Sequence, residues 1–465
     1  MSILLGVCLI AACAFEFING FQDTANSVAT IIYTKTLKPN FAVIWAGCWN
    51  FIGVSVGGIA VAMGIVNLLP SEALIDQNVY HALAMIFALI LTAILWNLTT
   101  WYFGIPCSSS HTMIGSIFGV GVAYMLLPGV NAIALNWSKV KDVGLSLLIS
   151  PVIGFGLALG AMALMKMIFK NKEILFEDHS KRKHPPFGIR TFLIFTSTLL
   201  SFSHGSNDGQ KGVGLIMIIL IALIPAKFAL DPHKTPIYLS NRAYQMENVI
   251  AKIDTSGISF EDKLRCQLLK VKLNHIHFAL DNARNFDSIR GNVNFDVRKD
   301  IITVSKEINN LLVKSFDEEP VKISKQDKYI LKSGVTYLKS YTEYSPWWVI
   351  LMVSLSLGIG TMIGWKRIVV TVGEKIGKTP LSYGQGASAN LVASFTIGLS
   401  TLFGLPVSTT HVLSSGVAGT MVSQKGLKNL RMKTVRNIMI AWLLTLPVTI
   451  VLSGSLFLLI RWIIG

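Results

Sequence analysis

Two short stretches of this chain, each occurring twice, decide its architecture. The first reads FGIPCSSSH at Phe103–His111 and returns as FGLPVSTTH at Phe403–His411, with five of the nine positions identical. The second reads GFQDTAN at Gly20–Asn26 and returns as GSNDGQK at Gly205–Lys211. Because both motifs occur in the same order in each half, the sequence predicts a protein built from two related halves.

The rest of the chain is strongly apolar. Hydrophobic residues make up 52% of it, the mean hydropathy is +0.56, and only 14% of residues are charged. A soluble domain carries about 25% charged residues. Ten segments reach or approach the roughly 20 apolar residues that span a bilayer: 3–33, 41–66, 80–103, 108–127, 143–169, 191–225, 346–365, 383–404, 407–422 and 437–463. Two of them, 108–127 and 407–422, are short and rich in Ser, Thr and Gly, which favours hairpin arms.

The motif spacing shows where the halves differ. Asp23 and His111 are 88 residues apart, whereas Asp208 and His411 are 203 apart. The difference is close to the length of the polar stretch 226–345, which contains 19 of the 41 basic residues and 15 of the 25 acidic ones. We therefore expect this stretch to be an extramembrane insert that interrupts the second half.

The distribution of basic residues predicts the topology. With the N-terminus outside, the inside loops carry 18 Lys and Arg, while the short outside loops and the C-terminal end carry three, as the positive-inside rule requires. The long stretch 226–345 also lies outside in this topology and is left out of the count, because long domains cross the membrane largely regardless of their charge. The second half then begins inside, so the fold is predicted as all-α, with two inverted repeats containing broken helices and hairpins. The predicted parts are a first membrane repeat at 1–169, a basic cytoplasmic loop at 170–190, a second membrane repeat at 191–225 and 346–465, and a helical, periplasmic insert at 226–345.

A few ionisable residues fall inside the apolar segments: Glu16, Asp23, Asp208 and Lys211, together with three histidines. Charges in the membrane are unfavourable and mark ion or substrate pathways. An Asp beside Gln or Asn supplies oxygen ligands for a cation or a carboxylate for a proton. The net charge of +16 is explained by basic loops, so we predict no nucleic-acid partner.

The Pro-x-Ser motifs resemble turns that open a helix. Hydroxyls and free N–H groups at a helix start point donors at one place, and helix N-termini bind phosphate and other anions. A single Ser/Thr run would favour helix packing instead, but the repeat beside Pro and His favours a binding site. The candidate phosphate ligands are Gln22, Ser108, Ser109, Ser110, Thr112, Asn207, Lys211, Ser408, Thr409 and Thr410.

The insert shows helical periodicity. Leu264, Leu268, Val271 and His275 are predicted to share one face of a helix, as are the four residues Ile301, Val304, Ile308 and Leu311. No metal-ligand cluster, disulfide framework or catalytic motif is evident, so we predict neither a metal site nor a cofactor, and a protein that is not an enzyme.

The two Asp-containing stretches, Asn19–Thr30 and Ser203–Gly212, resemble the hallmark of the Pit family of inorganic phosphate transporters, particularly its bacterial low-affinity members. The two Pro-x-Ser hairpins and Gly358–Trp365 are similar to that family as well. The resemblance implies phosphate import by symport with a cation, a homodimer, and a multi-pass protein of the bacterial inner membrane. The coupling residues that it implies are Asp23, Asn26 and Asp208, with Asp23 and Asp208 as the proton carriers. Glu16, which lies in the same apolar segment as Asp23, is a further coupling candidate, although it could also serve only to hydrogen-bond between helices.

The position equivalent to Asn26 holds Lys211, as in the proton-coupled type of the family. An ammonium there opposes a sodium ion at Asp208, so the resemblance implies proton coupling, with a neutral metal–phosphate complex as a form of the substrate. Two alternatives keep the fold: sodium-coupled phosphate transport and sulfate transport. A third reading is a sensor whose insert is the working part.

Overall fold

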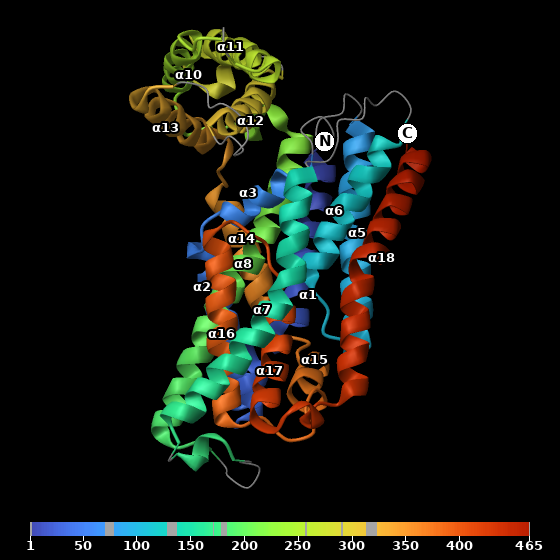
Figure 1. Cartoon of the computed structure of the whole chain (residues 1–465). Coiled ribbons are helices and arrows are strands. Elements are labelled where there is room, and N and C mark those ends of the chain that lie inside the picture. Colours follow the sequence, from blue (N-terminus) through green and yellow to red (C-terminus); the bar gives the residue numbers. More distant parts are fainter. Residues whose placement is uncertain are drawn as a thin grey trace. The chain divides into compact units, whose positions relative to one another are not determined.

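The computed structural model describes residues 2–69, 79–127, 137–170, 172–177, 184–255, 258–289, 292–312 and 323–464. Among them every regular element is a helix, apart from an isolated β-bridge between Gly377 and Leu430 (Figure 1). The predicted all-α class is therefore confirmed. Two compact units result: a membrane unit of 1–219 and 345–465, and an insert unit of 220–344.

Long apolar helices make up most of the membrane unit. Four described helices are long and apolar enough to cross a membrane: α1 (Ser2–Tyr33), α5 (Val79–Tyr102), α7 (Trp137–Ile168) and α18 (Met432–Ile464). The number rises to six if two bent helix pairs count as one span each. One of these pairs is α2 (Pro39–Val56) with α3 (Ala60–Val66), bent by 72°.

The remaining predicted segments also fall on helices, but these are shorter or more polar: α6 (Ser109–Met125), α8 (Phe187–Leu223), α14 (Trp347–Thr361), α16 (Tyr383–Leu402) and α17 (Thr409–Lys425). Length and composition alone therefore support fewer crossings than the ten segments. The loops used for the charge count lie partly outside the described residues, at 70–78, 128–136, 171 and 178–183.

The two Pro-x-Ser motifs form the same local structure. Each joins two helices, α5 to α6 and α16 to α17, through an extended stretch that begins at a glycine of positive φ, Gly104 (64°) or Gly404 (66°). Ser108 and Ser408 cap the second helix by accepting a hydrogen bond from the backbone N–H three residues on. Each proline thus lies two residues before the cap and not at the first helical position.

The two Asp motifs do not interrupt their helices. α1 and α8 are continuous through them, over 32 and 37 residues. The small residues serve close packing instead: a Cβ on Gly20 would lie 2.5 Å from the Leu357 oxygen, and one on Gly205 would lie 2.2 Å from the Asn50 oxygen. Glycine therefore brings a neighbouring helix backbone against each motif.

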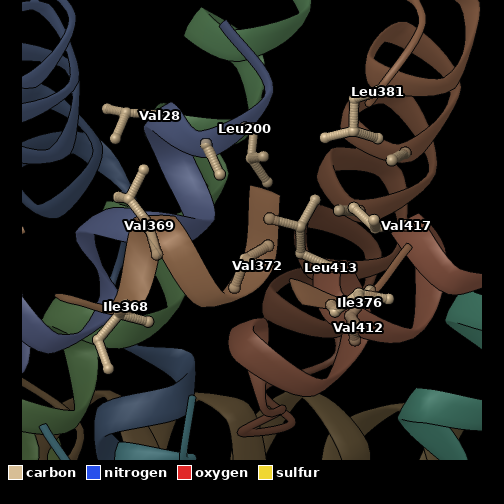
Figure 2. Packing of buried hydrophobic residues seen from close by; sticks show 14 of the residues in the cluster. Val28, Leu200, Ile368, Val369, Val372, Ile376, Leu381, Val412, Leu413 and Val417 are labelled. Atoms are coloured by element: carbon tan, nitrogen blue, oxygen red, sulfur yellow. The ribbon is translucent and has the colours of Figure 1, made fainter. Parts of the chain in front are cut away.

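A buried apolar cluster joins the motif helices α1 and α8 to their neighbours. Figure 2 shows buried side chains such as Val28, Leu200, Val372 and Leu413, contributed by α1, α8, a π-helical turn at Thr371–Lys375 and α17. The turn continues from α15 (Lys366–Val370). Elsewhere in the membrane unit, α18 packs along α5 and α6. Helix α17 packs against α7 and α16.

The insert unit is a small helical bundle with a core of its own. Its helices are α9 (Pro225–Phe228), α10 (Pro236–Ala251), α11 (Phe260–Leu280), α12 (Val293–Leu312) and α13 (Lys325–Thr342). A short 3₁₀ turn of this unit lies at Phe286–Ser288, and the membrane unit has two more, at Glu173–Leu175 and Leu427–Asn429.

One of the two helix faces predicted for the insert is buried and the other is not. On α12, Ile301, Val304, Ile308 and Leu311 share one helix face, as predicted, and that face is buried. On α11 the predicted residues share a helix face, but that face is exposed: Leu264 is 57% exposed, and the core residues are Cys266, Leu269, Leu273, Ile276 and Leu280. The helix carries two apolar stripes, and the stripe that begins at Cys266 is the one that packs against the other helices of the insert.

Candidate functional site

The polar residues of the two Asp motifs meet in the interior of the membrane unit. Gln22, Asp23, Asn26, Asn207, Asp208 and Lys211 are all at most 1% exposed. Continuous helices hold them, so the positions of their side chains are set by helix packing. Buried polar groups need hydrogen-bond partners, and the two hairpin tips provide most of these partners.

Asp23 accepts hydrogen bonds from both halves of the chain. The Ser109 hydroxyl donates to Oδ2 at 2.8 Å and the Thr410 hydroxyl donates to Oδ1 at 2.5 Å. The Asn26 amide donates to Oδ1 at 3.3 Å. Three donors on one carboxylate stabilise its charged form.

Asp208 is bound by a cation. Lys211 Nζ lies 2.6 Å from its Oδ1, and the Thr409 hydroxyl donates to Oδ2 at 3.1 Å. Lys211 also donates to the Ser110 hydroxyl and to the Val407 carbonyl. This lysine therefore connects the second Asp motif to both hairpin tips.

The last positions of the two Asp motifs make equivalent contacts across the halves. Asn26, in the first half, donates to Thr410 of the second hairpin at 2.9 Å. Lys211, in the second half, donates to Ser110 of the first hairpin. The third hydroxyl of each hairpin is thus held by the motif of the other half.

The N-terminal ends of α6 and α17 approach one another at this centre. The Ser110 hydroxyl donates to the Val407 carbonyl at 2.8 Å, and the His111 and His411 rings lie 4.5 Å apart. Trp442 stacks on His411 at 4.0 Å, and its indole N–H donates to Pro106. Two helix N-termini facing one place create a favourable environment for an anion.

Not every predicted ligand faces this centre. Ser108 and Ser408 are occupied in capping, and the Thr112 hydroxyl donates to Ser108 O within its own helix. Gln22 donates to Thr100 and Asn207 donates to Thr401, so both fix their motif to the helix before the hairpin tip. The hydroxyls that reach the Asp residues or Lys211 are those of Ser109, Ser110, Thr409 and Thr410.

His204 was not among the predicted site residues, yet it lies between the two carboxylates. Its Nε2 is 3.3 Å from Asp208 and 4.0 Å from Asp23, and its Nδ1 is 3.1 Å from Asn50. The available signal was its position, one helical turn before Asp208. Ligand atoms of the three ionisable residues lie within 4.8 Å of one another, but the Lys211 ammonium beside Asp208 opposes a divalent cation there.

The fold and this site define a class: a polytopic helical membrane protein with a buried polar centre between two hairpin tips. The chain belongs to the phosphate transporter family, whose sequence pattern matches residues 19–453.

Three similar proteins show how far the likeness extends. A low-affinity inorganic phosphate transporter of Buchnera aphidicola is 40% identical, over 98% of this chain and 96% of that protein. The low-affinity inorganic phosphate transporter PitA of Escherichia coli is 39% identical, over 97% and 96%. A solved structure titled the sodium-dependent phosphate transporter has a TM-score of 0.55 over the full length of both chains. It is only 20% identical, which supports the fold alone.

Proposed function

We propose that this protein is a secondary active transporter that imports inorganic phosphate by proton symport across the bacterial inner membrane. The observation that carries the proposal is the convergence of hydroxyls from two facing helix N-termini on Asp23, Asp208 and Lys211. The named activity of the similar bacterial transporters supports phosphate as the substrate.

Phosphate is a tetrahedral anion that needs several donors at once. In the proposal these are the hydroxyls of Ser109, Ser110, Thr409 and Thr410, with the Lys211 ammonium. In the structure these groups bond chiefly to the two Asp carboxylates. Phosphate binding therefore requires them to exchange a carboxylate for a phosphate oxygen.

The charge of the centre favours a co-transported cation. With Glu16, Asp23 and Asp208 all ionised, three carboxylates and one Lys leave it net negative, and adding an anion to a buried negative site is strongly disfavoured. A proton on one of the buried carboxyls of Glu16, Asp23 or Asp208 reduces that penalty by one unit of charge. Lys211 already lies where a sodium ion at Asp208 would be expected, so we propose the proton. The proposal includes the neutral complex of phosphate with a divalent metal as a transported form.

The remaining parts of the proposal concern architecture. The repeats 1–169 and 191–225 with 346–465 are inverted, the N-terminus is periplasmic, and the two halves move to expose the centre to either side in turn. The loop 170–190 is cytoplasmic, the insert 226–345 is periplasmic, and the protein is a homodimer. The equivalent cross-contacts of Asn26 and Lys211 support two related halves around one centre.

Uptake of labelled phosphate into proteoliposomes tests the substrate. We expect uptake that unlabelled phosphate competes with and that sulfate at the same concentration does not, with protein-free liposomes as the control. Sulfate uptake that phosphate leaves unaffected would contradict the proposal.

A further inference from the structure

We propose that Glu16 carries the coupling proton, while Asp23 and Asp208 stay ionised to organise the phosphate donors. The inference rests on the proposed function and assigns one residue to its proton. It comes from a comparison of the three carboxyl groups buried around the site.

Glu16 is fully buried and has the poorest hydrogen bonding of the three. Its Oε2 accepts one bond, from the neutral Asn19 amide at 3.2 Å. Its Oε1 has no hydrogen-bond partner among the described residues. Asp23 has three donors, and Asp208 has an ammonium and a hydroxyl.

This difference determines which group is neutral. A buried carboxylate with few donors is strongly disfavoured and takes up a proton instead, whereas donors and cations stabilise the charged form. The carboxyl of Glu16 therefore carries a proton in the arrangement that the structure shows. The two Asp carboxylates remain charged and hold the hydroxyls and Lys211 in place.

Glu16 is also close enough to the site for the charges there to act on its carboxyl group. Its carboxyl group packs against α8 at Gly212, where a Cβ would lie 2.5 Å from Glu16 Cδ. The ionisable groups that act on it are His204, Asp208 and Lys211 of α8, and Cys13 on its own helix interacts with it as well. Glu16 thus contacts Gly212, the residue that follows Lys211, and Lys211 is the cation that we propose binds phosphate.

Lys211 couples phosphate binding to the protonation of Glu16. While phosphate neutralises the ammonium, Glu16 keeps the proton that it took from the outside solution. When the site opens to the inside and phosphate leaves, water reaches Glu16 and phosphate no longer offsets the positive charge of Lys211. Both changes favour ionised Glu16, and the same proton follows into the cytoplasm. One proton enters and leaves at the same carboxyl oxygen, with no other bond made or broken.

Glu16→Gln separates coupling from binding, because the amide keeps the size of the side chain and cannot release a proton. In proteoliposomes with phosphate on both sides, we expect phosphate exchange to continue. Accumulation driven by a pH gradient should fall at least tenfold, and the co-transported proton should vanish from an external pH-dye signal. Glu16→Asp should recover part of the accumulation, and Glu177→Gln, at an exposed loop residue, is the control.

Two results would overturn the inference. One is pH-driven accumulation by Glu16→Gln at the wild-type level. The other is loss of exchange together with accumulation in a variant that elutes as the wild type does, which would assign Glu16 to phosphate binding. If Glu16→Gln fails to fold, Glu16→Asp decides, and its loss of exchange together with accumulation contradicts the assignment. Absence of exchange in the wild type would instead sink the proposed function.

Discussion

At the residue scale, the ion pair between Lys211 and Asp208 dominates the electrostatics of the site. Both side chains are within 2% of complete burial, and their charged atoms are 2.6 Å apart. A buried pair contributes little net stability compared with apolar residues, but removing one partner leaves an uncompensated charge. The pair is therefore sensitive to single substitutions and tolerant of a matched double one.

The double substitution tests this directly. Lys211→Met should lower the free energy of unfolding by about 3–5 kcal/mol, because the buried Asp208 carboxylate loses the ammonium that compensates its charge. Asp208→Asn combined with Lys211→Met should recover most of that stability. Thermal unfolding in detergent measures both. If the double variant is less stable than either single one, the pair stabilises the fold more than our account allows.

Sequence reasoning reached the chemical groups of the site better than their contacts. The repeats identified Asp23, Asp208 and the hairpin hydroxyls, since repetition distinguishes them from ordinary helix packing. The roles of Thr112, Gln22 and Asn207 could not be separated in this way, because they depend on which direction a hydroxyl or amide faces. His204 was missed since a single buried histidine looks the same in sequence whether it faces a site or not.

At the element scale, glycines decide how closely the motif helices approach their neighbours. Gly205 faces the Asn50 backbone, whereas Gly188, in the same helix, has no atom within 4 Å of its ideal Cβ position. Helix continuity through the motifs follows from this packing. Composition alone did not reveal it, because glycine equally suits an unwound helix.

The two glycines make a matched pair of variants. Gly205→Ala should lower the free energy of unfolding by about 1–3 kcal/mol, because the helices must separate to make room for the added methyl group. Gly188→Ala should be neutral or slightly stabilising. Melting temperatures in detergent provide the comparison, and equal effects at both positions would contradict the packing.

Cys266 reports on the insert core. It is 1% exposed, and burial raises the pKa of its thiol, so less thiolate is present at neutral pH than for an exposed cysteine. In a protein whose other cysteines are replaced by serine, a maleimide should modify it slowly at pH 7 and faster as the pH rises or the insert unfolds. The control is a protein in which Cys266 is also replaced by serine and the one cysteine stands at exposed Gln267. Equal rates at both positions would refute this packing.

At the scale of the whole molecule, the two compact units separate two interpretations. The insert unit has its own apolar core, and the candidate site lies entirely in the membrane unit. The transporter account places transport there, whereas the sensor interpretation makes the insert the working part.

Replacing residues 230–340 with a short Gly/Ser linker should leave phosphate transport measurable, although reduced. Uptake into proteoliposomes is the readout, with elution in detergent as a check on folding. A well-folded deletion protein without any transport would favour the sensor interpretation.

The coupling ion tests the central claim most directly. Proteoliposomes containing the purified protein are given either an inward pH gradient without sodium or an inward sodium gradient at equal pH, and accumulation of labelled phosphate is followed. Our account predicts accumulation with the pH gradient that collapses when a protonophore is added, and none with sodium alone. Accumulation with the sodium gradient and none with the pH gradient would contradict it.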